Sequence, residues 1–200
     1  MAKINVMLKI RTFKLTDLAK DDVKLKILRL IDEEWREEDI EYEGDLQNVI
    51  SSYAHNLAYS KLKKLGKGYY VEVEITAPGY SAAEGVGEFD SVYPLLFPRP
   101  ARLCRVGIIP KNNDVGKEDG ISLENIKWID FTSDEIYVYE GLIEVAGEWQ
   151  SIIIETDQGT RVITPNEIVQ VAIKPKIKVK KVKRKRRKKR RRKKKRSRKK

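Results

Sequence analysis

The chain is poor in the residues that enzymes most often use for nucleophilic or metal chemistry. Its 200 residues include one histidine, His55, and one cysteine, Cys104. A single cysteine cannot form an intramolecular disulfide, and these two residues cannot supply the ligand set of a structural zinc site. The sequence also lacks a glycine-rich phosphate-binding loop and a dinucleotide-binding G-x-G-x-x-G between a strand and a helix. It therefore predicts no enzyme, no metal, no cofactor and no small-molecule substrate.

His55 and Cys104 could each have a catalytic or a structural role. A base and nucleophile pair between them would support covalent catalysis. His55, however, falls beside the apolar stripe of an expected helix, where a structural role is favoured. Cys104 lies in the apolar run 103–106, where a buried free cysteine behaves as a small hydrophobic residue.

Carboxylates offer one remaining route to catalysis. A nuclease would hold two or three of them around a metal ion. The best candidates are Glu72, Glu74, Asp130 and Glu144, because Glu72 and Glu74 share a strand face by the period of two. Nothing in the spacing requires the four to converge, and a solvated strand face has the same pattern. The second interpretation is favoured.

Long hydrophobic runs are absent. No segment approaches the roughly 20 apolar residues that span a bilayer, and Lys9 and Arg11 interrupt any apolar core of a signal peptide. We expect a protein of the cytoplasm or of a virion, neither secreted nor membrane-bound. The body is rich in Ile, Val, Lys and Glu, a balance typical of proteins from hot environments.

The absence of acid from the last 27 residues is the most informative feature. Residues 174–200 contain 22 of the 42 lysines and arginines and none of the 30 acids, so 20 basic and 30 acidic residues remain in 1–173. The formal charge is −10 on the body and +22 on the tail. The residues expected to bind nucleic acid are Lys176, Lys178, Lys180, Lys181, Lys183, Arg184, Lys185, Arg186, Arg187, Lys188, Lys189, Arg190, Arg191, Arg192, Lys193, Lys194, Lys195, Arg196, Arg198, Lys199 and Lys200.

Such a tail cannot collapse on itself, because its charges repel and it has little apolar surface to bury. It requires a polyanion, and nucleic acid is favoured because each neutralised phosphate releases a counterion. The tail has no aromatic residue, glycine, asparagine or glutamine. It therefore predicts phosphate contact without base recognition. A localisation signal would need only 5–8 basic residues.

An acidic body with a basic arm resembles viral shell proteins, whose terminal arms line the genome while their folded domains tile. The resemblance implies self-association and a packaged genome, with DNA favoured over RNA. Together with the composition of the body, it leads us to expect a virus of a thermophilic, archaeal host. Three alternatives stay open. These are a ribosomal or ribosome-associated protein with a basic extension among rRNA helices, a chromatin or nucleoid protein, and an enzyme tethered to nucleic acid by its tail.

Hydrophobic periodicity predicts an α+β fold. An N-terminal strand, two helices and a strand are packed with, or followed by, a β-rich small barrel or meander. The expected domains are 1–109 (α+β), 110–173 (β-rich) and 174–200 (basic tail). The expected helices run from Thr16 or Asp17 to Trp35 and from Asp45 to Leu65. The expected strands are 4–10, 69–76, 103–109, 125–131, 135–145, 149–155, 160–164 and 168–173, with a hairpin turn at Asp157-Gln158-Gly159.

Residues 77–100 break this periodicity with prolines and glycines. A loop of this length is usually functional or ordered by a partner. Its aromatic residues lack interleaved lysines and arginines, which disfavours base stacking. We therefore predict that Phe89, Tyr93 and Phe97 form a protein–protein interface. The glycines Gly85 and Gly87 are interpreted as flexible loop residues.

Overall fold

The computed structural model describes residues 1–89, 97–111, 125–139 and 143–164. Within these ranges the chain forms ten strands and one helix, and every strand pairing is antiparallel. The elements are β1 (Ala2–Lys20), β2 (Val23–Tyr42), α1 (Leu46–Leu65), β3 (Tyr69–Ala77), β4 (Tyr80–Glu88), β5 (Ala101–Pro110), β6 (Lys127–Asp130), β7 (Ile136–Val138), β8 (Ile143–Val145), β9 (Trp149–Thr156) and β10 (Gly159–Ile163).

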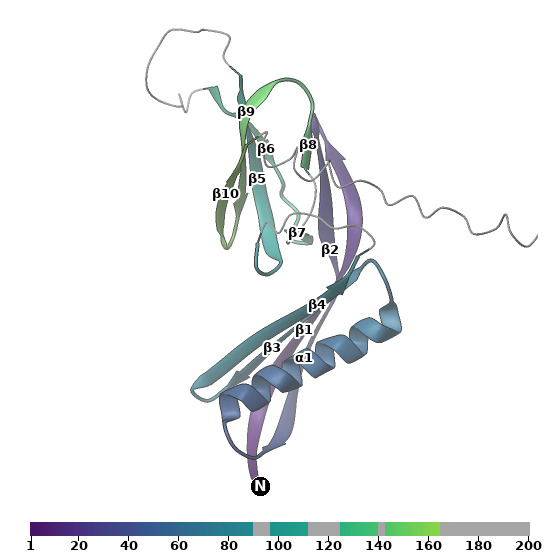
Figure 1. Cartoon of the computed structure of the whole chain (residues 1–200), viewed down its shortest axis with the longest axis vertical. Coiled ribbons are helices and arrows are strands. Elements are labelled where there is room, and N and C mark those ends of the chain that lie inside the picture. The colour runs from purple at the N-terminus through teal and green to yellow at the C-terminus, as the bar shows by residue number, and fades with distance from the viewer. Residues whose placement is uncertain (90–96, 112–124, 140–142, 165–200) are drawn as a thin grey trace, which may run out of the picture.

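The first expected helix is wrong, because its residues lie in the long hairpin of β1 and β2 (Figure 1). Asp21 and Asp22 form the turn, with Asp21 at a φ of 50°, and pairing runs from Lys20↔Val23 to Ala2↔Tyr42. Residues 23–27 alternate apolar and lysine with a period of two, which suits a half-buried strand. The helical spacing of these residues does not describe one face of the strand: Leu25 and Leu28 are buried in different clusters, and Ile31 and Trp35 are exposed. The expected arrangement of a strand, two helices and a strand is therefore incorrect.

The hairpin connects two layers of hydrophobic core. The sheet order is β10-β9-β5-β7-β2-β1-β3-β4, with β6 pairing β5 and β8 pairing β2. The register shifts where Thr12 pairs with Asp32 and Phe13 pairs with Leu30, so Ile31 is an extra residue in β2. Such a bulge moves the buried face of a strand from odd-numbered to even-numbered positions. The N-terminal half of β2 buries Val23, Leu25 and Ile27 in one core cluster, and its C-terminal half buries Ile40 in another.

The lower layer is a four-stranded sheet of β2, β1, β3 and β4 covered on one face by α1. The apolar stripe predicted for this helix is confirmed, since Ile50, Ala54, Ala58 and Leu62 are buried in one cluster with residues of β1 and β3. The helix packs mainly against β3 and β4, and it also contacts β2 through Tyr53 with Glu38 and through Lys61 with Asp32. It ends at Gly66, whose positive φ of 87° suits glycine at a helix terminus.

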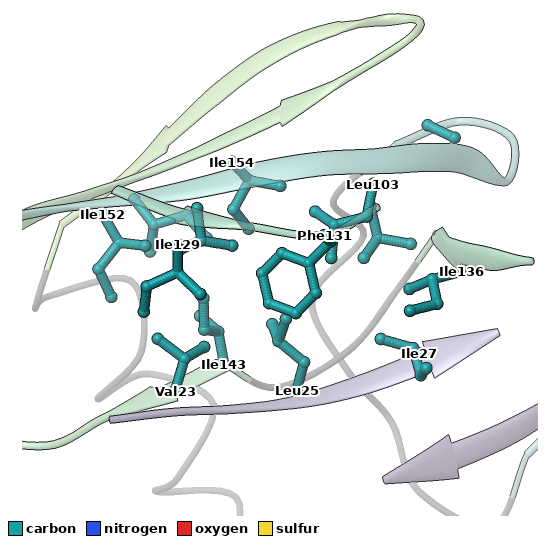
Figure 2. Close-up of a cluster of buried hydrophobic side chains, with 14 of the residues drawn as sticks. Val23, Leu25, Ile27, Leu103, Ile129, Phe131, Ile136, Ile143, Ile152 and Ile154 are labelled. Carbon is teal, nitrogen blue, oxygen red and sulfur yellow. The ribbon is translucent and has the colours of Figure 1, made fainter. Parts of the chain in front are cut away.

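The upper layer joins the hairpin end of β2 to the β-rich part of the chain. Figure 2 shows Val23, Leu25 and Ile27 of β2 facing residues of the strands that follow residue 100. Ile143, Ile152 and Ile154 are among those residues. The β-rich strands are therefore not a separate barrel, because β7 and β8 pair with β2 in the same sheet.

Most strands expected after residue 100 are confirmed with shifted bounds. They are β5, β6, β9 and β10, and Asp157 and Gln158 form the predicted hairpin turn between β9 and β10. The expected strand 135–145 contains the two short strands β7 and β8. The expected strand 168–173 and the whole basic tail lie outside the described residues.

The predicted loop 77–100 is wrong for residues 80–88, which form β4 and pair with β3. Gly85 and Gly87 are strand residues with a packing function. A Cβ atom on Gly85 would lie 1.7 Å from the hydroxyl oxygen of Tyr70, and one on Gly87 would lie 2.8 Å from Cδ2 of the same ring. The glycines make room for Tyr70, which is buried with Phe13 and Tyr137.

Candidate interaction surfaces

The described body concentrates negative charge on one strand. Eight acids lie in residues 32–43, at the C-terminal half of β2 and just beyond it, where Arg36 is the single basic residue. Most of them are exposed. An exposed run of this kind favours basic partners and repels another acidic surface.

The same half of β2 has an edge without a partner strand in the described part of the chain. β8 pairs with β2 at 23–25 and β7 pairs with it at 28–29. From Ile31 to Tyr42, β1 on the other side is the only partner of β2 among the described residues. An open edge presents backbone N–H and C=O groups to any extended chain that reaches it.

A groove of about 490 Å³ lies between this edge and α1. Its floor and one wall come from residues 38–41 of β2, and the other wall comes from Asn48, Val49, Ser52, Tyr53 and Asn56 of α1. The hydroxyl of Tyr53 donates a hydrogen bond to Glu38 across the groove. Burial, and then this carboxylate, raise the pKa of Tyr53 above its ordinary value. The groove therefore combines an apolar strip with a negatively charged border.

The opposite face of the lower sheet carries a buried charge cluster. Glu72 of β3 is 1% exposed and pairs across the strands with Arg11 of β1. Arg11 Nε lies 3.1 Å from Glu72 Oε1, and Arg99 Nε lies 3.2 Å from Glu72 Oε2. Arg99 comes from the segment before β5, so the cluster links the two layers of the molecule.

Glu72 also stabilises the charged form of Arg11. Burial by itself lowers the pKa of Arg11, but the hydrogen bond and negative charge of Glu72 outweigh that effect, so the pKa lies above its ordinary value. The Arg11 guanidinium additionally lies 5.4 Å from the ring centres of Phe13 and Tyr137. With both its arginines in place, Glu72 has the surroundings of a structural ion pair.

The four candidate catalytic carboxylates do not converge on one site. Glu72 and Glu74 do share a face of β3, and Arg99 Nη2 lies 4.0 Å from Glu74. Asp130 is in β6 and Glu144 is in β8, where it pairs with Lys24 of β2. Across the described ranges, no group of three or more His, Cys, Asp and Glu residues is arranged to hold a metal ion.

His55 and Cys104 are both exposed, on α1 and β5 respectively. The expectation that Cys104 is a buried hydrophobic residue is therefore wrong. The two residues lie on elements of different layers and form no pair.

The three aromatic residues of the predicted protein–protein interface do not form one surface in the described part of the chain. Phe97 is 7% exposed and belongs to the upper core, and Phe89 is half-buried against the aromatic cluster of Phe13, Leu28, Tyr70 and Tyr137. Tyr93 lies outside the described residues. The basic residues 176–200 of the predicted nucleic-acid site also lie outside them.

Sequence reasoning missed the groove, although a signal for it exists. Asn48, Ser52 and Asn56 recur every four residues, so they form one small polar stripe on α1 beside the apolar stripe. This stripe follows the acidic run after a short turn. Only the fold shows that both border the same groove.

Comparison of the chain with models of protein families, with curated proteins and with solved structures found no match. No helix in the described part of the chain is long and apolar enough to cross a membrane.

Proposed function

We propose that the protein is a structural, non-enzymatic component of a nucleoprotein assembly, and that its basic tail binds packaged nucleic acid through phosphates. The most specific form of the proposal is a shell protein of a virus from a hot environment, with DNA as the genome. The observation that carries it is the division of charge, −10 on residues 1–173 and +22 on residues 174–200.

A further observation supports this proposal. The acids of the body are gathered on the exposed half of β2, where they repel nucleic acid and leave the tail as the region that attracts it.

The test is deletion of residues 175–200, which removes none of the described core. We expect nearly all affinity for duplex DNA to disappear while the far-UV circular dichroism of the body remains. A matched control changes every tail arginine to lysine, which keeps the charge and removes the bidentate guanidinium. Since phosphate attraction depends mainly on charge, this control should retain most of the affinity.

Salt dependence gives a second measurement on the full-length protein. If about half of the tail charges meet phosphates, log K against log salt on duplex DNA should have a slope of about −10. A truncated body that keeps most of its affinity would contradict the proposal. So would a large preference for one DNA sequence at constant salt. Sequencing the nucleic acid that copurifies separates a viral genome from ribosomal RNA.

A further inference from the structure

We propose that the groove between β2 and α1 is a docking site for a second copy of this chain, which inserts residues 175–182 as an added β-strand. The occupant is the first part of the basic tail, Pro-Lys-Ile-Lys-Val-Lys-Lys-Val. The pure charge of residues 183–200 is left for nucleic acid. This interaction between copies goes beyond the phosphate binding proposed above and does not depend on it.

The backbone of β2 is suited to accept a strand. Its edge from Asp32 to Tyr42 has no neighbour in the described part of the chain, and β1 holds its other edge in continuous register. Strand addition uses such an edge for main-chain hydrogen bonds and uses pockets for alternate side chains. A length of several residues is enough, because strands in globular proteins average about 5–6 residues.

The groove supplies a pocket on one side of the added strand. In an extended segment, Ile177 and Val179 project to one face and Lys176, Lys178 and Lys180 to the other. Val49 and Tyr53 of α1 form the apolar part of the groove that Ile177 and Val179 would enter. The lysines would then lie on the other face of the sheet.

That other face is acidic along the edge. By the register with β1, the odd-numbered residues of this half of β2 lie on the face away from α1. They are Glu33, Trp35, Glu37, Asp39 and Glu41. Lysines of the added strand would lie beside these carboxylates at cross-strand distance, where opposite charges stabilise a pair of strands. Glu38, on the groove side, adds a further negative charge.

The acids also explain why the edge would select this partner. Charged residues on an edge strand usually prevent pairing with identical edges. Two acidic β2 edges repel each other, whereas a basic strand is attracted. The edge is thus protected against β2–β2 pairing and open to a tail.

The reach of the chain favours a second copy over the molecule's own tail. β10 ends in the upper layer, where its last residue, Ile163, is buried in the same cluster as Val23 at the hairpin end of β2, and Figure 1 places α1 at the other end of the molecule. From Asp22 to Glu38 the hairpin runs for about 53 Å at about 3.3 Å per residue. The thirteen residue-to-residue steps from Thr164 to Ile177 reach about 47 Å when the chain is fully extended. A neighbouring copy has no such restriction.

The test measures self-association of nuclease-treated, full-length protein by sedimentation velocity in the absence of nucleic acid. We expect concentration-dependent association that weakens with added salt. Ile177→Glu with Val179→Glu removes both apolar anchors and should weaken association at least about tenfold. The matched control, Arg186→Gln with Arg187→Gln, lowers the net charge by the same two units outside the docking segment and should leave most of the association intact.

The groove is tested from its other side by Ser52→Arg, which places a long cationic side chain at an exposed position of its α1 wall. It should weaken association at least as strongly as the tail variant. Ser60→Arg makes the same exchange at an exposed α1 position that does not line the groove, and should have no effect. Circular dichroism of each variant confirms that α1 is retained.

Crosslinking decides which copy supplies the strand. In a Cys104→Ser background, chains carrying Asp39→Cys are mixed with differently sized chains carrying Lys178→Cys and treated with a short bis-maleimide. Docking between copies predicts a mixed dimer. A crosslinked monomer from the doubly substituted chain, with no mixed dimer, shows that the molecule's own tail fills the groove and overturns the proposal.

Two other results also overturn it. One is a wild-type protein that stays monomeric at all concentrations, and the other is association insensitive to both the tail and the Ser52 variants. A different result would contradict the proposed function, namely a protein that keeps its affinity for DNA after the tail is deleted. The two proposals are therefore tested separately.

Discussion

Breaking the buried ion pair of Arg11 and Glu72 should be costly, whereas replacing both residues together should not. Glu72→Leu leaves the Arg11 guanidinium, 12% exposed, without its carboxylate. An unpaired buried charge of this kind costs about 3–5 kcal/mol. Arg11→Met should cost less, about 1–3 kcal/mol, because Arg99 still lies 3.2 Å from Glu72 and its side chain is 40% exposed to solvent. Arg11→Met with Glu72→Leu removes both charges and should return the free energy of unfolding to within about 1 kcal/mol of wild type.

Urea denaturation of the four proteins measures this cycle. For a slope of about 2 kcal/mol per molar urea, a loss of 3 kcal/mol lowers the midpoint by about 1.5 M. The coupling energy should persist at 1 M salt, because a buried pair is screened much less than an exposed one. The exposed pair of Lys3 and Glu41, whose atoms lie 2.9 Å apart, is the control and should show a coupling below about 1 kcal/mol.

Additive effects of Arg11→Met and Glu72→Leu would refute this reasoning. A coupling energy below about 0.5 kcal/mol would mean that the two charges act independently. The buried carboxylate would then need another explanation, and the catalytic interpretation of Glu72 would regain weight.

Two further predictions concern the aromatic cluster beside this pair. Gly85→Ala should destabilise the protein by about 1–3 kcal/mol, because the added methyl group meets the Tyr70 ring; a change below about 0.5 kcal/mol in urea denaturation would contradict the packing seen here. Burial, and then the negative charges of Tyr139 and Glu72, raise the pKa of Tyr70. The contribution of Tyr70 to the free energy of unfolding is therefore complete below the ordinary tyrosine pKa of about 10, and it is lost as the pH rises above that pKa. Unfolding measured from about pH 8 to about pH 11 should therefore show a shallower alkaline loss in Tyr70→Phe than in wild type, with exposed Tyr59→Phe as the control that keeps the wild-type slope.

Local pattern was enough to predict several elements of this protein. The apolar residues of α1 follow the helical period over five turns and end at a glycine, so no distant contact is needed to recognise the helix. The alternation in 69–76 and the Asp157-Gln158-Gly159 turn likewise predict β3 and the β9–β10 hairpin. The charge of residues 174–200 is a property of composition alone.

The acidic run of β2 shows where local pattern is insufficient. Glutamate favours helices, and residues 32–38 contain four of them. That preference amounts to tenths of a kcal/mol per residue, whereas pairing with β1 supplies a continuous ladder of backbone hydrogen bonds and buries Ile40 in the lower core. Tertiary pairing therefore overrides the local preference.

Long-range pairing also decided the surfaces on which the proposals rest. The sequence by itself determined the charge division, the helix 46–65 and the alternating strands, because each depends on neighbours only a few residues apart. The tertiary structure alone decided that Glu72 is enclosed by Arg11 and Arg99 and that Gly85 makes room for the ring of Tyr70. It also decided that β2 and α1 border one groove. Each of these depends on residues brought together from distant parts of the chain, and no local period records which strand will be the neighbour.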